Sequence, residues 1–198
     1  MGQVTGRFRV LVIGAIALAM SVLLAQGWGL EQSPFKAQAQ GNAPPQALAP
    51  ALPMVSYSFE DPQGRFQIGI FDGYSVSAAG GNPLFQAADG SLAYTVAVAP
   101  LPADNAPDAA LLAAAKGTFG NGEGFVAGDV QPLPGGGVRI NWAGRLSQGA
   151  AAPQPIVGKI FARQRGDEVF LLLVAATPAA ENQVSDAISA LGSTLIVP

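Results

Sequence analysis

Apolar and polar residues alternate along most of the chain downstream of residue 54. Between residues 65 and 71, for example, Phe66, Ile68 and Ile70 alternate with polar residues or glycine. This period of two is typical of a strand that buries one face. On the same pattern, we predict strands over residues 55–59, 65–71, 83–87, 92–99, 125–131, 138–148, 155–165 and 169–176. The last of these, VFLLLVAA, is apolar throughout, which indicates a central strand.

Turn-forming residues join these predicted strands in pairs. Pro62 and Gly64 lie between the first two strands, and Asp89-Gly90 lies between the next two. The segment PLPGGG at residues 132–137 and the dipeptide Gly166-Asp167 separate the later pairs. Short turns of this kind connect antiparallel neighbours. The sequence therefore predicts a sheet built from hairpins.

Two segments carry helical patterns instead. Residues 108–119 are rich in helix formers, follow Pro107 and end in a glycine-rich stretch. A second helix is predicted over residues 179–193, after a cap at Thr177-Pro178, because Val184, Ile188 and Leu191 recur at helical spacing. The order of elements predicts an α+β domain, with a mainly antiparallel β-sheet covered by helices.

The N-terminal segment has the pattern of an export signal. Arg7 and Arg9 precede an apolar run over residues 10–25, which is short for a membrane-spanning helix. Cleavage is expected after Gly27 or after Ala39, the latter giving a mature start at Gln40, and an uncleaved anchor is the alternative. We therefore assign residues 1–39 to the export segment, 40–54 to a Pro/Ala-rich linker and 55–198 to a single domain in a periplasm, a thylakoid lumen or the exterior.

Missing residue types exclude many chemistries. The chain has no cysteine and no histidine, which removes disulfides, thiolate nucleophiles, Ser-His-Asp triads and the usual zinc and copper sites. Lys116 and Lys159 could each support a serine nucleophile, but no nucleophile-elbow glycine pattern lies near either. We predict a protein that is not an enzyme and that holds no cofactor and no metal.

The basic residues are few and follow a pattern. Without residues 1–39 the chain keeps seven basic and twelve acidic residues, for a net charge of −5, which argues against binding nucleic acid. Strand periodicity places Arg139 and Arg145 on one face of their strand, opposite to Ile140 and Trp142. If the next strand pairs with it, its basic residues join the same solvent-facing surface; they are Lys159, Arg163 and Arg165. This surface is a candidate dock for an acidic protein or an anionic membrane, and the alternative is a solvated sheet face. The protein is expected to be a monomer.

Several local segments resemble those of a known family. The segment YSFED at residues 57–61, followed by GRFQI at 64–68, is similar to the beginning of PsbP-like proteins, whereas FDGY at 71–74 departs from their proline-glycine-tryptophan segment. The strand at 169–176, the following helix and the apolar stretch at 194–197 fit the family's end. The chain thus resembles the PsbP side of the Mog1/PsbP-like fold over residues 55–198.

This resemblance implies an αβα sandwich and a non-enzymatic protein of the thylakoid lumen, associated with photosystem II or its assembly. The histidine-based metal binding of the family does not carry over, since the chain has no histidine. An extracytoplasmic binding or chaperone-like module for a small apolar ligand or peptide is the alternative. It is suggested by Phe71, Tyr74 and Phe85, which lie near glycine-rich loops.

Overall fold

The computed structural model describes residues 51–103, 106–147 and 152–198. The export segment, both candidate cleavage sites and most of the predicted linker lie outside these residues. Within the described ranges, no helix is long and apolar enough to cross a membrane.

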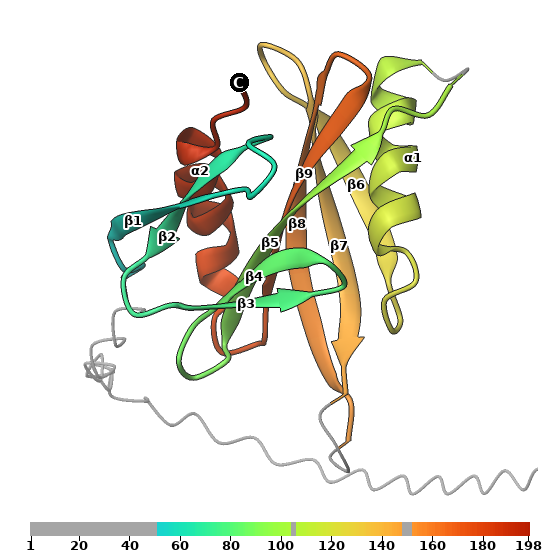
Figure 1. The fold of residues 1–198 in the computed structure, drawn as a ribbon. Helices are drawn as coiled ribbons and strands as arrows, with labels where there is room; N and C mark the ends of the chain where they lie inside the picture. The colour runs from blue at the N-terminus through green and yellow to red at the C-terminus, as the bar shows by residue number, and fades with distance from the viewer. Residues whose placement is uncertain (1–50, 104–105, 148–151) are drawn as a thin grey trace, which may run out of the picture. The chain divides into compact units, whose positions relative to one another are not determined.

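The centre of the domain is a seven-stranded antiparallel sheet (Figure 1). From one edge to the other, its strands are β3 (Ser75–Ala79), β4 (Asn82–Gln86), β5 (Leu92–Pro100), β9 (Glu168–Ala176), β8 (Gln154–Arg165), β7 (Val138–Leu146) and β6 (Val126–Pro132). The apolar strand β9 lies between β5 and β8, so its side chains enter hydrophobic clusters on both faces of the sheet. Phe170, Leu172 and Val174 belong to one cluster, and Val169 and Leu171 belong to the other.

The helix α1 (Pro107–Phe119) covers one face of this sheet. Proline suits the first turn of a helix, where its missing N–H donor is not needed. The buried side of α1 consists of Leu111 and small alanines, which pack with Ile140 and Ile160. Small residues on this side let the helix lie close to the sheet.

The other face carries a second layer made of a helix and a small sheet. It contains α2 (Val184–Thr194) and the antiparallel pair β1 (Val55–Glu60) and β2 (Gln67–Phe71). Val184, Ile188 and Leu191 of α2 are buried in the cluster on this side. The chain after α2 is held by Ile196, whose backbone exchanges two hydrogen bonds of 2.9 Å with Gln67.

The architecture confirms the predicted α+β class, an antiparallel sheet with helical layers on both faces. The predicted order lacked one strand, because β3 pairs with β4 in a hairpin that the sequence pattern did not reveal. The predicted start of the second helix was also wrong. Thr177 does not cap it but donates its hydroxyl to the Ser91 carbonyl at 3.4 Å, and a short 3-10 turn, η1 (Glu181–Gln183), precedes α2.

Candidate functional site

The strand register brings the predicted basic residues of β7 and β8 to one face of the sheet. Arg139 of β7 lies opposite Phe161 of β8, and Lys159 of β8 lies opposite Asn141. Arg163 faces Phe170 of β9, which belongs to the cluster on the α2 side. Because paired residues project from the same face of a sheet, these three basic residues surround Phe161 on the α2 side.

We expected the whole of this face to be exposed to solvent, but α2 covers part of it. α2 packs on it, and the Lys159 ammonium donates a 2.7 Å hydrogen bond to the Ser185 hydroxyl of α2. Arg139 is half-buried, and its Nε atom is buried with no acceptor among the described residues. Arg163 and Arg165 lie farther along β8 and are exposed. The sequence pattern could not predict this cover, because strand periodicity assigns residues to a face of the sheet but does not reveal which element packs on that face.

Arg145 lies apart from the other basic residues. It is six positions from Arg139 along β7, which corresponds to about 20 Å in an extended strand. Its side chain passes beside Gly124, in the loop between α1 and β6, and a Cβ added to that glycine would lie 3.3 Å from the Arg145 Cγ. The predicted surface therefore divides into a cluster of Arg139, Lys159, Arg163 and Arg165, and a separate exposed Arg145.

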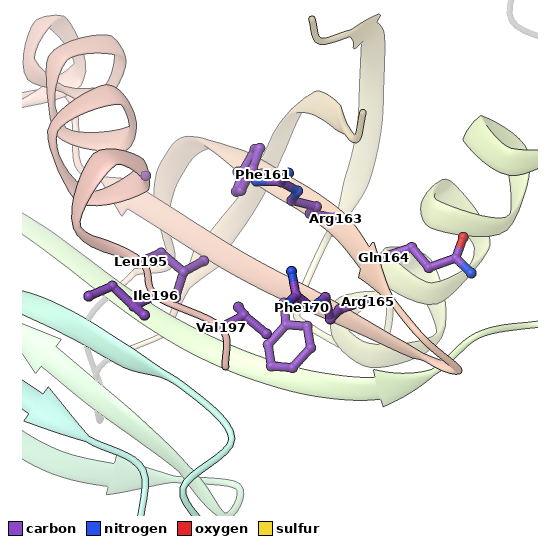
Figure 2. A pocket seen from close by; sticks show the side chains of 9 residues that line it. Phe161, Arg163, Gln164, Arg165, Phe170, Leu195, Ile196 and Val197 are labelled. Atoms are coloured by element: carbon purple, nitrogen blue, oxygen red, sulfur yellow. The ribbon is translucent and has the colours of Figure 1, made fainter. Parts of the chain in front are cut away.

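A groove of about 320 Å³ lies beside the outer part of this cluster (Figure 2). Phe161 and Phe170 line it from the sheet. The residues that follow α2 line it from the other side; they are Leu195, Ile196 and Val197. Gly192 of α2 also borders the groove, and a Cβ added there would meet no atom within 4 Å. The groove therefore has largely apolar walls.

Two guanidinium groups also border this groove, those of Arg163 and Arg165. Within the described residues, the one salt bridge joins Arg65 to Asp61 at 2.7 Å, so neither arginine of the groove has a carboxylate within 4 Å. Glu168 lies opposite Arg165 across the β8–β9 hairpin without forming a salt bridge. The groove thus combines an apolar interior with positive charge that is not paired.

The Asp61–Arg65 pair closes the turn between β1 and β2. Asp61 is buried and accepts hydrogen bonds from the Arg65 guanidinium at 2.7 and 3.1 Å and from the Arg65 backbone at 3.3 Å. The Arg65 hydrogen bond holds the pKa of Asp61 below its usual value. This is a structural ion pair that fixes the turn between β1 and β2.

The aromatic residues that suggested a small-ligand site belong to the core. Phe71 and Phe85 are buried, and the Phe85 ring stacks on Tyr94 with centroids 4.5 Å apart. Tyr74 packs against Phe71 and Tyr94, and burial raises the pKa of its hydroxyl to about 12. The sequence argument for a ligand at these rings is therefore wrong.

Sequence reasoning missed the groove because its walls come from the β8–β9 hairpin and from the C-terminal end of α2 with the residues after it, and only tertiary packing brings these two segments together. One signal was available: Phe161 is an aromatic residue in a row that otherwise holds Lys159, Arg163 and Arg165. A large apolar side chain on a cationic row indicates a surface that is covered in part. As for metals, no three acidic side chains gather closely enough to hold an ion in the described ranges.

Comparisons with known proteins support the fold. No family model matches the chain, and no curated protein matches it. The crystal structure of the Saccharomyces cerevisiae Ran-binding protein Mog1p superposes with a TM-score of 0.51 at 9% identity, over 71% of this chain and 94% of that one. The chain has the Mog1/PsbP-like fold.

Two further structures are similar at lower scores. The solution structure of cyanobacterial PsbP (CyanoP) from Synechocystis gives a TM-score of 0.49 at 10% identity, over 80% of this chain and 99% of that one. A crystal structure from Bacteroides thetaiotaomicron also gives 0.49 at 10% identity; this chain covers 49% of it, about half its length, with 73% of its own residues. At such identities the Mog1/PsbP-like likeness concerns the fold alone.

Proposed function

We propose that the chain is an exported, non-enzymatic accessory protein that docks on a membrane complex. Arg139, Lys159, Arg163 and Arg165 contact an acidic protein surface, and Arg145 adds a separate charge at the far end of β7. The chain encounters this partner outside the cytoplasm, after the export segment of residues 1–39 has directed it across the membrane.

The observation that carries the proposal is the uneven distribution of charge. Downstream of residue 39 the chain is acidic overall, yet five of its seven basic residues lie on the neighbouring strands β7 and β8. None of the five has a carboxylate within 4 Å in the described part of the chain. A cluster of unpaired cations speeds encounter with a surface of opposite charge and selects against basic partners.

The PsbP-like resemblance of the sequence specifies one form of this proposal, in which the complex is photosystem II and the compartment is the thylakoid lumen. In that form, the protein is expected to co-purify with photosystem II from membranes of its host. A host without photosynthesis would exclude this form and leave the docking proposal intact.

The docking proposal is tested by measuring how the exported protein binds to membranes isolated from its host. Binding is expected to weaken as salt rises, because salt screens exposed charges. The variant with Arg145→Gln, Arg163→Gln and Arg165→Gln removes three exposed basic residues of β7 and β8. It is expected to bind at least about ten-fold more weakly at low salt, the loss expected when several charge contacts are removed. Its melting temperature should change little, because exposed charges contribute little to stability.

The matched control is Lys116→Gln, which removes a cation from the exposed side of α1. It should bind like the parent protein. Binding of the triple variant at parental strength would contradict the proposal, as would binding that does not respond to salt. Equal binding to protein-free vesicles of anionic lipid would identify the membrane surface, in place of an acidic protein, as the partner.

A further inference from the structure

The groove between β8, β9 and the chain after α2 combines exposed apolar walls with positive charge at its border. Its walls expose apolar side chains, including Ile196, which is 58% exposed. Exposed apolar area costs free energy in water, and an exposed apolar patch bordered by polar groups marks a binding surface. The positive charge at its border indicates which class of ligand would be retained.

We infer that this groove binds a single-chain anionic amphiphile, namely a medium-chain fatty acid whose carboxylate meets Arg163 and Arg165. The inference goes beyond docking on a membrane complex and does not depend on it. The apolar chain of the ligand lies between Phe161 on one side and Leu195 to Val197 on the other.

The head group follows from the side chains at the border. A guanidinium presents a planar fork of donors that matches the two oxygens of a carboxylate, and it retains its charge at any physiological pH. Arg163 and Arg165 are both exposed, and neither is neutralised within the described residues. The groove residues include no carboxylate that would repel an anion.

The size of the groove sets the length of the chain. A volume of 320 Å³ is near the lower limit of about 300 Å³ for pockets that bind small molecules. It equals about ten times the share of liquid volume that one water molecule occupies. A chain of about ten carbon atoms fills such a space, whereas the two chains of a phospholipid do not fit.

Gly192 keeps this space open. It stands on the side of α2 that borders the groove, and a side chain there would enter empty space. A long side chain at this position therefore fills the groove without displacing the core. Gly117 in α1 is the matched control, since a Cβ added there also meets nothing within 4 Å and lies far from the groove lining.

Calorimetric titration of the exported protein with octanoate, decanoate and dodecanoate, each below its micelle concentration, tests the inference. Affinity is expected to rise about four-fold for each methylene added between octanoate and decanoate, as for burial of apolar surface, and to level off by dodecanoate. Decyltrimethylammonium, with the same chain and the opposite charge, should bind at least about ten-fold more weakly than decanoate, because its head group meets two guanidiniums.

Three variants separate the ligand site from the fold. Gly192→Met should abolish decanoate binding, whereas Gly117→Met should leave it unchanged. The double variant Arg163→Gln, Arg165→Gln should bind decanoate and decyltrimethylammonium with similar affinities, because only the apolar contacts remain. This loss of discrimination is a readout that a mere change in stability would not produce.

Several results would overturn the inference. They are the absence of decanoate binding, equal affinities of the parent protein for the two head groups, and unchanged binding by Gly192→Met. Binding to vesicles of anionic lipid without binding of monomeric decanoate would also overturn it, and would identify the membrane surface as the docking partner. Conversely, a protein that binds decanoate but shows no salt-sensitive membrane association would retain the groove and lose the docking function.

Discussion

At the scale of single residues, Asp61 is the clearest case of a charge committed to structure. It is buried, and the hydrogen bond from Arg65 lowers its pKa below the usual value. A carboxyl group with a lowered folded-state pKa contributes stability above its unfolded-state pKa, and this contribution is lost as the pH falls through the folded-state value. The turn between β1 and β2 therefore becomes weaker in acid.

We expect Asp61→Asn to lower the free energy of unfolding at pH 7 by about 1–2 kcal/mol, because Arg65 loses its charged acceptor while remaining partly solvated. The difference between parent and variant should shrink as the pH falls below about 4, the region in which an ordinary aspartate is protonated. Urea unfolding at several pH values measures it. Asp89→Asn, at an exposed turn, is the comparison and should show a smaller gap; a constant gap for Asp61→Asn would contradict the assignment.

Arg139 gives a prediction of the opposite sign. Its buried Nε has no acceptor among the described residues, and a buried donor without a partner costs about 1–3 kcal/mol. Arg139→Met keeps an unbranched side chain as far as the position of Nε and removes this donor, so the melting temperature should equal or exceed that of the parent protein. A clear decrease would mean that the guanidinium makes a stabilising contact in solution.

At the scale of elements, the strands and helices that the sequence predicted correctly, and those it did not, have identifiable physical reasons. The hairpins formed by β1–β2, β4–β5, β6–β7 and β8–β9 follow from alternation and turn residues, and all four occur. β3 was missed because all of its residues are exposed, so an edge strand of small residues shows no apolar alternation. The predicted start of α2 was wrong because Thr177, a residue typical of helix caps, instead donates its hydroxyl hydrogen bond to the Ser91 carbonyl of another segment.

Which helix covers which face of the sheet could not be predicted, since this depends on contacts between distant segments. The alternation of residues along β7 correctly placed Arg139 on the opposite face from Ile140 and Trp142. It could not reveal that α2 would reach Lys159, or that the chain after α2 would return along β2 and wall a groove. The sequence therefore predicted the charged residues of the candidate site, but the groove beside them arises from tertiary packing.

The close packing of β7, β8 and β9 requires a glycine at position 158. The Trp142 indole donates a 3.3 Å hydrogen bond to the Val174 carbonyl, across the position of Gly158. A Cβ at Gly158 would lie 2.5 Å from the Trp142 Nε1 and would collide with the Val174 carbonyl oxygen. Since a backbone atom cannot move aside freely, glycine is required at this point of the strand.

We therefore expect Gly158→Ala to destabilise the domain by about 1–3 kcal/mol, the usual cost of overpacking. Chemical denaturation of the chain from residue 40 onward, in which Trp142 is the one tryptophan, measures the effect by fluorescence. Gly117→Ala is the control, because it adds a methyl group to open space in a helix and should be neutral or stabilising by up to about 1 kcal/mol. A neutral result for Gly158→Ala would mean that the indole does not cross β8 as described.

At the scale of the whole molecule, the central strand β9 joins two hydrophobic clusters. Leu171 belongs to the cluster under α1, and its neighbour Leu172 belongs to the cluster under α2; both are fully buried. Because adjacent residues of a strand project to opposite faces, one strand ties the two layers together. Loss of either cluster would then remove the support of the other.

We expect Leu171→Ala and Leu172→Ala each to lower the free energy of unfolding by about 2–5 kcal/mol, as for other large buried side chains. Each variant should still unfold in a single transition, because β9 cannot leave one cluster while remaining in the other. Trp142 fluorescence reports on the α1 side, and far-ultraviolet circular dichroism reports on the whole domain. The two midpoints should coincide in both variants, and a Leu172→Ala protein whose Trp142 transition stays at the parental midpoint would show that the layers unfold separately.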